Sequence, residues 1–249
     1  MQIVIGVKMV KLLISLLIFA SLGWGDMAAF VEQKIAANPL VWAPYKVAAH
    51  FIHYNSKLNA QKLRVKLFSA KHLGQDVIVV FKGDRLLYYV KDGQIVRDQE
   101  WSGFTYNFPV KVALGSRPSY WTPEGEYYIC RKNPNSQFIK FLGISYPNNN
   151  DAKKGLESGM LTPNQYKAIV QANAEKKGPP WYTPLGGRFG VHSAPTWMKP
   201  ILRAKEKQNP DVTWVTRKDF TEGCVGVENR IVEYLFANVP EGTPILLLP

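Results

Sequence analysis

The sequence predicts a mainly β domain, an antiparallel sandwich or barrel, with a helical segment before it and a helical insertion within it. Short runs of β-branched and aromatic residues recur from residue 77 onward, and glycine-containing turns separate the first of them. Strands at this spacing are typical of antiparallel β domains. Before residue 74 the chain instead shows alanine-rich and charged stretches with helical periodicity.

The N-terminus predicts export. Lys8 and Lys11 precede an almost wholly apolar run at residues 12–20, and small residues follow at 21–25, which is the pattern of a signal peptide. An uncleaved membrane anchor is the alternative, because neighbouring apolar residues would lengthen the run toward a bilayer span. We therefore expect a signal peptide or anchor at 1–25 and a location in the periplasm or cell envelope.

The elements follow in order. A helical segment is expected at 26–73 and the main domain at 74–249. Lys82-Gly83-Asp84 joins the first two strands as a hairpin. Strands are expected at 77–81, 85–90, 108–114, 125–131, 138–145, 187–192 and 244–248, and a short amphipathic helix at 229–237.

An insertion at 148–180 interrupts the strands. It follows a polar turn cluster at 146–151, and its helix begins with Thr162 as N-cap and Pro163 at the first helical position, running to about Lys176. The insertion either forms a lid beside an active-site cleft or is a surface loop, and the sequence leaves both open.

One cysteine stands in a setting that suits a nucleophile. Cys224 follows Gly223 in a tight turn, and His192 lies upstream as a possible base. The thiolate is the attacking species, so such a cysteine needs a base or positive charge nearby. A glycine before it frees backbone N–H groups, here those of Gly223 and Cys224, for a developing oxyanion.

The remaining cysteine and histidines give no second site. With two cysteines, one Cys130–Cys224 disulfide is the most that can form, and we expect instead that Cys130 is a small buried hydrophobe. His50 and His53 lie three residues apart, but no Cys, Asp or Glu stands nearby to complete a metal site. We expect no metal and no cofactor.

The C-terminal part resembles the L,D-transpeptidase (YkuD-like) catalytic domain family over residues 75–249. The matching residues are His192-Ser193, then Thr221-Glu222-Gly223-Cys224-Val225 and Asn229, with Val112-Ala113-Leu114-Gly115 and Thr122-Pro123-Glu124-Gly125 upstream. Two departures are Glu222, where many members carry a second histidine, and Gly226, where many carry an arginine thought to meet a substrate carboxylate.

The resemblance implies a YkuD-like sandwich or barrel and an exported cysteine enzyme that acts on peptidoglycan stem peptides through a thioester. Cys224 is then the nucleophile, His192 the base, Ser193 its orienting residue through the backbone carbonyl, and Thr221 a hydrogen-bond donor or a cap of the turn. Arg188, Arg217 and Asn229 are the substrate-binding candidates. An amine acceptor gives cross-linking, lipoprotein attachment or D-amino acid exchange, and water gives a hydrolase.

The net charge of +12 favours an anionic partner or merely keeps the protein soluble. Export and the lack of an Arg/Lys-rich run or nucleic-acid motif argue against nucleic acid, whereas stem peptides expose carboxylates. A non-catalytic cell-wall-binding domain is the alternative from another class, because Glu222 would raise the thiol pKa if it pointed inward. The N-terminal segment is the part expected to contact a membrane.

Overall fold

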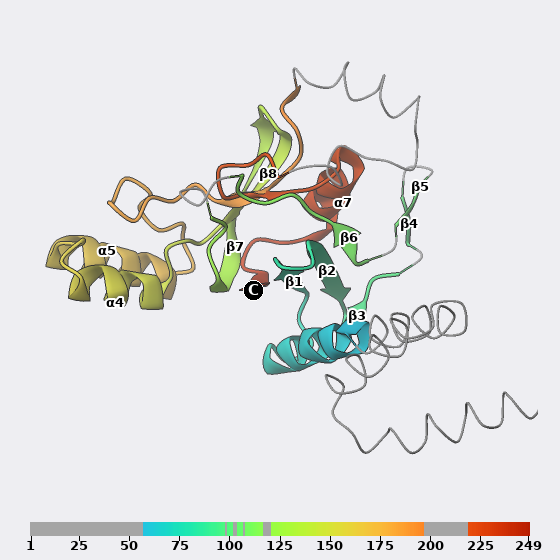
Figure 1. Cartoon of the computed structure of the whole chain (residues 1–249), viewed down its shortest axis with the longest axis horizontal. Coiled ribbons are helices and arrows are strands. Elements are labelled where there is room, and N and C mark those ends of the chain that lie inside the picture. Colours follow the sequence, from blue (N-terminus) through green and yellow to red (C-terminus); the bar gives the residue numbers. More distant parts are fainter. Residues whose placement is uncertain (1–56, 98, 102–103, 107, 117–120, 197–218) are drawn as a thin grey trace, which may run out of the picture. The chain divides into compact units, whose positions relative to one another are not determined.

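The structure is a computed structural model that describes residues 57–97, 99–101, 104–106, 108–116, 121–196 and 219–249 (Figure 1). The chain divides into two compact units, Met1–Arg64 and Val65–Pro249, and the sheet belongs to the second. The expected signal segment, most of the expected N-terminal helical region and Arg217 lie outside the described residues. Within that region, residues 57–71 are helical.

A curled, mainly antiparallel sheet forms the centre of the second unit, so the predicted fold class is confirmed. Its order is β10-β9-β8-β7-β11-β1-β2-β3, with β6 also paired to β2, and two of the pairings, β1–β11 and β9–β10, are parallel. The strands are β1 (Val77–Phe81), β2 (Leu86–Lys91), β3 (Gln94–Ile95), β6 (Val110–Lys111), β7 (Gly125–Ser136), β8 (Ile139–Ile144), β9 (Gly190–His192), β10 (Val225–Gly226) and β11 (Pro244–Leu248). A separate pair consists of β4 (Gln99–Trp101) and β5 (Phe104–Tyr106).

The predicted β1–β2 hairpin is confirmed, and its first strand is buried along its whole length. All five β1 residues are buried because β1 lies between β2 and β11 and is covered on both faces. This explains why its sequence is a continuous apolar run rather than an alternating one.

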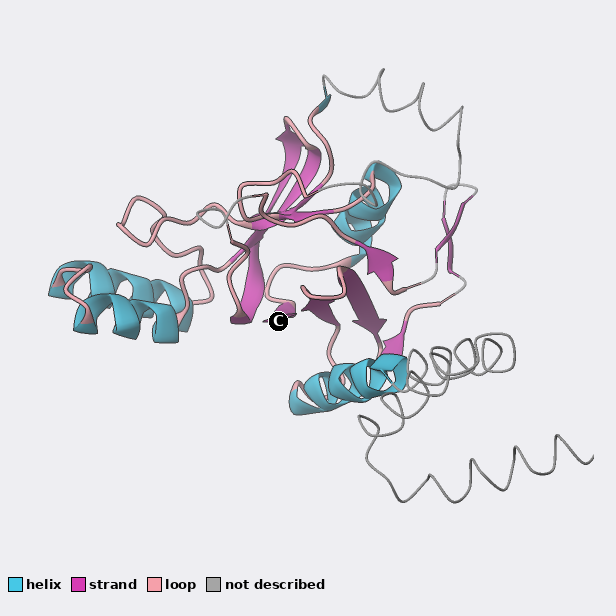
Figure 2. Ribbon diagram, viewed as in Figure 1, coloured by secondary structure: helices cyan, strands magenta, loops and turns pink. Residues whose placement is uncertain are grey.

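Helix α7 (Asn229–Asn238) packs on one face of the sheet, which we call the core face (Figure 2). Its apolar stripe, Ile231, Val232, Tyr234 and Leu235, is buried against alternate residues of the strands, among them Leu142 and Val191. The amphipathic helix expected at 229–237 is therefore confirmed. Because side chains alternate along a strand, the neighbours of Leu142 and Val191 project to the opposite face.

Two antiparallel helices, α4 (Asn149–Glu157) and α5 (Pro163–Ala174), make up most of the expected insertion (Figure 2). The Thr162 cap and the Pro163 start of α5 are confirmed, and Gln165 completes a capping box. The prediction of a turn through residue 151 was wrong, because α4 begins at Asn149 with Asn148 as its N-cap. The Asp151 carboxylate accepts a hydrogen bond from the N–H of Asn148, which completes a capping box. Asn and Asp favour helix N-caps as well as turns, so composition alone did not separate the two.

The strand expected at 108–114 is only partly formed, because the segment exchanges one partner for another. Val110 and Lys111 pair with β2, and Ala113 then exchanges two backbone hydrogen bonds with Gly226, each 2.8 Å long. Pro109 has no N–H to extend the pairing with β2. The segment thereby ties β2 to the turn that carries Cys224.

None of the helices in the described part of the chain has the length and apolar character needed to cross a membrane.

Candidate active site

His192 lies on the face of the sheet opposite the core face, which we call the site face. Its ring is 3% exposed and stacks on Phe138, with centroids 4.0 Å apart, while Phe141 lies directly opposite on β8. Its Nδ1 donates a 2.7 Å hydrogen bond to the carbonyl of Ser193, because a carbonyl oxygen can only accept. Nε2 is therefore the nitrogen that can accept a proton.

Cys224 comes to the same face from the neighbouring strand. Val225 and Gly226 pair in parallel with Val191 and His192, so Cys224 stands next to Gly190 and two positions from His192. Strand spacings place the two Cα atoms about 8 Å apart on that diagonal. The structure thus brings Cys224 and His192 together on one face of paired strands.

Burial keeps the thiol protonated in the resting protein. Burial and, to a smaller extent, the charge of Glu222 raise the pKa of Cys224 to about 11, although a backbone hydrogen bond from Gly190 acts to lower it. Burial also lowers the pKa of His192. A neutral thiol and a neutral imidazole are the stable pair at pH 7, so the proton has to move when a substrate is attacked. The thiol itself is 3.8 Å from the carbonyl oxygen of Arg188.

Thr221 closes the turn that presents Cys224. Its hydroxyl donates to the Cys224 carbonyl at 2.7 Å and accepts from the Gly223 N–H at 3.2 Å. The Gly223 N–H, expected as an oxyanion donor, is therefore already engaged, which leaves the Cys224 N–H as the donor to consider. Thr221 acts as the cap of the turn.

Gly223 is required by both conformation and space. Its φ of +110° is one that side chains with a Cβ rarely adopt, and a Cβ there would lie 2.2 Å from the ring of Phe189. At Gly226 a Cβ would lie 2.7 Å from the Phe220 ring. The Phe220 ring thus fills the space that a side chain at position 226 would need, and this is the position where the resemblance leads one to expect arginine.

The two substrate-binding candidates that the structure describes have different settings. Arg188 has its guanidinium carbon 3.4 Å from the centroid of the Trp181 ring. Asn229 is the first residue of α7, and among the described residues its buried Oδ1 has no hydrogen-bond donor. Arg217 lies outside the described residues. Of the two candidates that the structure describes, Arg188 contacts the thiol, and it does so through its backbone carbonyl.

Two features of the site escaped the sequence analysis. Arg131 lines a cavity together with Arg188, and the bulge around Cys130 breaks the alternation that would have shown which face Arg131 occupies. The second is an ion pair in which Asp219 binds the Arg85 guanidinium through both carboxylate oxygens and accepts from the Leu114 N–H at 3.0 Å. Asp219 lies two residues before Thr221, so this pair anchors the start of the nucleophile turn.

Cys130 lies apart from this chemistry. Its half-buried thiol donates to the Gly143 carbonyl at 3.4 Å, and burial raises its pKa to about 11. Within the described ranges no group of three His, Cys, Asp or Glu side chains is placed to hold a metal ion.

The fold and the site define a class of β domain in which a curled sheet holds a thiol and an imidazole on neighbouring segments of the chain. The chain belongs to the family of the L,D-transpeptidase catalytic domain (YkuD), whose model matches residues 75–247.

Solved structures of L,D-transpeptidases share limited similarity with the chain. One from Enterococcus faecium is 16% identical, with a TM-score of 0.36 and coverage of 70% of this chain and 49% of that one. L,D-transpeptidase 3 from Mycobacterium tuberculosis is 14% identical, with a TM-score of 0.41 and coverage of 70% and 61%. The chain therefore spans about half to three-fifths of the length of these proteins. A search of curated proteins found no match.

Proposed function

We propose that the protein is an exported cysteine enzyme that acts on peptidoglycan stem peptides through a thioester, as an L,D-transpeptidase. The observation that carries the proposal is the placement of Cys224 and His192 on one face of two paired strands, with His192 Nδ1 fixed on the Ser193 carbonyl. Membership of the family supports the choice of substrate.

In the first half-reaction Cys224 attacks the carbonyl between the third residue, a diamino acid, and the terminal D-residue. The thiol proton passes to Nε2 of His192 as the sulfur–carbon bond forms. The Cys224 N–H is the candidate donor to the oxyanion. Collapse breaks the carbon–nitrogen bond, His192 returns the proton to the leaving amine, and a thioester remains.

In the second half-reaction an acceptor attacks the thioester, and His192 takes its proton. The carbon–sulfur bond then breaks, and His192 returns the proton to the sulfur of Cys224. An amine of another stem peptide gives a cross-link, an amine of a lipoprotein gives an attachment, and a free D-amino acid gives exchange. Water gives a shortened stem peptide and makes the protein a hydrolase. The Ser193 carbonyl has the same task in each case, because it keeps Nε2 free to accept the proton.

Export and a location in the periplasm or cell envelope are part of the proposal. They rest on the signal-like pattern at residues 1–25, which also is the segment proposed to contact the membrane. The net positive charge of the chain fits a polyanionic envelope polymer as partner.

The test is product analysis with the mature protein and a disaccharide-tetrapeptide, with and without a D-amino acid as acceptor. We expect release of the terminal D-residue by the wild type and none by Cys224→Ala, with the fold retained by circular dichroism. Exchanged product marks a transferase, and tripeptide alone marks the hydrolase. Equal turnover by Cys224→Ala would contradict the mechanism, and binding without any product would identify a cell-wall-binding domain instead.

A further inference from the structure

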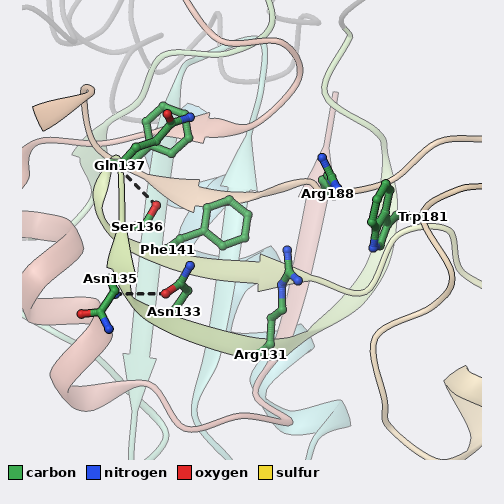
Figure 3. A pocket seen from close by; sticks show the side chains of 9 residues that line it. Arg131, Asn133, Asn135, Ser136, Gln137, Phe141, Trp181 and Arg188 are labelled. Atoms are coloured by element: carbon green, nitrogen blue, oxygen red, sulfur yellow. Dashed lines mark hydrogen bonds between the residues drawn. The ribbon is translucent and has the colours of Figure 1, made fainter. Parts of the chain in front are cut away.

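A cavity of about 390 Å³ opens on the site face (Figure 3). Its walls come from the β7–β8 hairpin and from the segment that precedes β9. The lining residues are Arg131, Asn133, Asn135, Ser136, Gln137, Phe138, Phe141, Trp181 and Arg188.

Residues that contact each member of the proposed catalytic pair line the cavity, although His192 and Cys224 themselves do not. Phe138 and Phe141, which stack on the His192 ring, are also wall residues. Arg188 lines the cavity, and its backbone carbonyl accepts a hydrogen bond from the Cys224 thiol. A group held in this cavity would therefore be separated from the proposed catalytic pair by no more than these shared contact residues.

The cavity carries two positive charges and no negative one. Its only ionisable lining side chains are those of Arg131 and Arg188, and the other polar ones are neutral amides and a hydroxyl. Within the described residues neither arginine forms an ion pair with a carboxylate. Two guanidinium groups in a concave site with aromatic walls favour an anion, and a carboxylate best fits their planar donor geometry.

Arg131 is directed into the cavity by the local backbone. The register of β7 against β8 shifts between Ile129 and Arg131, so a bulge re-aims the side chain. Arg131 then pairs with Gly143, where a Cβ would lie 2.7 Å from the Arg131 Cγ. The arginine stem thus occupies the space that glycine leaves, and its guanidinium carbon lies 5.6 Å from the centre of the Phe141 ring.

Arg188 is held from the other wall. Its φ of +61° is unusual for a residue with a side chain and marks a conformation fixed by its surroundings. The guanidinium stacks on the Trp181 ring, whose partial exposure of 44% leaves one side at the surface. In Figure 3 the Arg131 side chain extends toward the wall on which Arg188 and Trp181 lie.

We propose that Arg131 and Arg188 form a carboxylate subsite that binds a free carboxylate of the donor stem peptide close to the scissile bond. The subsite rests on the proposed function for its choice of ligand. Two sources share this chemistry, the α-carboxylate of the terminal D-residue and the side-chain carboxylate of a diamino acid such as diaminopimelate. Arg131 and Arg188 are specificity-determining residues that recognise the substrate and do not react with it.

The experiment measures binding calorimetrically in the full mature chain carrying Cys224→Ala, so that no chemistry is needed. Three donors are used: a disaccharide-tetrapeptide with both carboxylates free, one with the terminal carboxylate amidated, and one with the side-chain carboxylate amidated. The variants are Arg131→Gln, Arg188→Gln and Gly143→Ala, the last displacing the Arg131 stem without removing charge. Lys132→Gln is the matched control, because Lys132 is the next residue but lies over Phe236 on the core face.

We expect Arg131→Gln and Arg188→Gln each to weaken binding of the fully acidic donor about tenfold to a hundredfold, as loss of a charge-assisted hydrogen bond does. Gly143→Ala should weaken it in the same direction, and Lys132→Gln should change it less than twofold. One of the two amidated donors should bind the protein more weakly from the start, and the arginine variants should not weaken its binding further. The carboxylate that is blocked in that donor is the one that the subsite binds.

Equal losses on all three donors, a loss with Lys132→Gln as large as with Arg131→Gln, or no binding of any donor would overturn the subsite. The proposed function has a separate readout, since a wild type that binds the donors through Arg131 but never releases the D-residue would refute catalysis and leave the subsite standing.

Discussion

Replacing Gly223 with alanine tests whether the nucleophile turn is built as described. The added Cβ would lie 2.2 Å from Cε1 of Phe189, and the residue would keep a φ of +110°. Overpacking a filled site costs about 1–3 kcal/mol, and a left-handed conformation costs a residue with a Cβ about 1–2 kcal/mol. We therefore expect Gly223→Ala to lower the free energy of unfolding by about 2–5 kcal/mol.

Gly242→Ala is the matched control for the backbone contribution. Gly242 also has positive φ, +91°, but a Cβ there meets no atom within 4 Å. This variant should lose only the conformational part, about 1–2 kcal/mol. Urea unfolding followed by tryptophan fluorescence gives both values, and the excess loss in Gly223→Ala reports the contact with Phe189.

The same pair of variants should separate in activity. Because the turn must move away from Phe189 to make room, Gly223→Ala displaces Cys224, and D-residue release should fall more than tenfold. Gly242→Ala should retain the wild-type rate. Equal destabilisation of the two variants, or a fully active Gly223→Ala, would refute the placement of Phe189 against the turn.

Three further predictions concern the same region. Thr221→Val removes the hydroxyl that bonds the Cys224 carbonyl and the Gly223 N–H, so unfolding free energy should fall by about 1–3 kcal/mol in denaturant titrations, and an unchanged midpoint would contradict the capping role. The hydrogen bond from Arg85 lowers the pKa of Asp219, so the stability that this pair contributes is present above the ordinary carboxyl pKa and is lost as the pH falls through the lower pKa of the folded state. The difference in unfolding free energy between the wild type and Asp219→Asn should therefore shrink below about pH 4. A constant difference down to about pH 2 would contradict this role of the pair. The third prediction uses Cys130→Ser, which should keep full turnover and leaves Cys224 as the thiol that reacts. The rate of its alkylation by iodoacetamide should keep rising toward about pH 11. A plateau of this rate below about pH 8.5 would show that the thiol is not buried as described.

Much of the fold could be read from periodicity. The apolar run at 77–81, the glycine turn after it and the Thr162-Pro163 helix start are local signals, and each formed as expected. Segments whose partners change along their length could not be read in this way. The stretch at 108–114 leaves β2 for Gly226, and that choice depends on residues more than 100 positions away.

The site divides in the same manner. Cys224 and His192 could be singled out by residue type and by the glycine turn, but only the parallel pairing of β9 with β10 places them on one face. Arg131 had no local signal, because the bulge at Cys130 shifts the alternation of β7 by one residue. The Asp219–Arg85 pair joins positions 134 residues apart, which spacing along the chain does not reveal.

The central claim, that Cys224 becomes acylated with His192 as its base, is tested most directly by intact mass spectrometry of the mature protein mixed with disaccharide-tetrapeptide. The account predicts a mass gain equal to the donor minus its terminal D-residue, located on the peptide that contains Cys224. His192→Gln should form the adduct at least a hundredfold more slowly, and Cys224→Ala should form none. An adduct on another residue, or equal acylation in His192→Gln, would contradict the account.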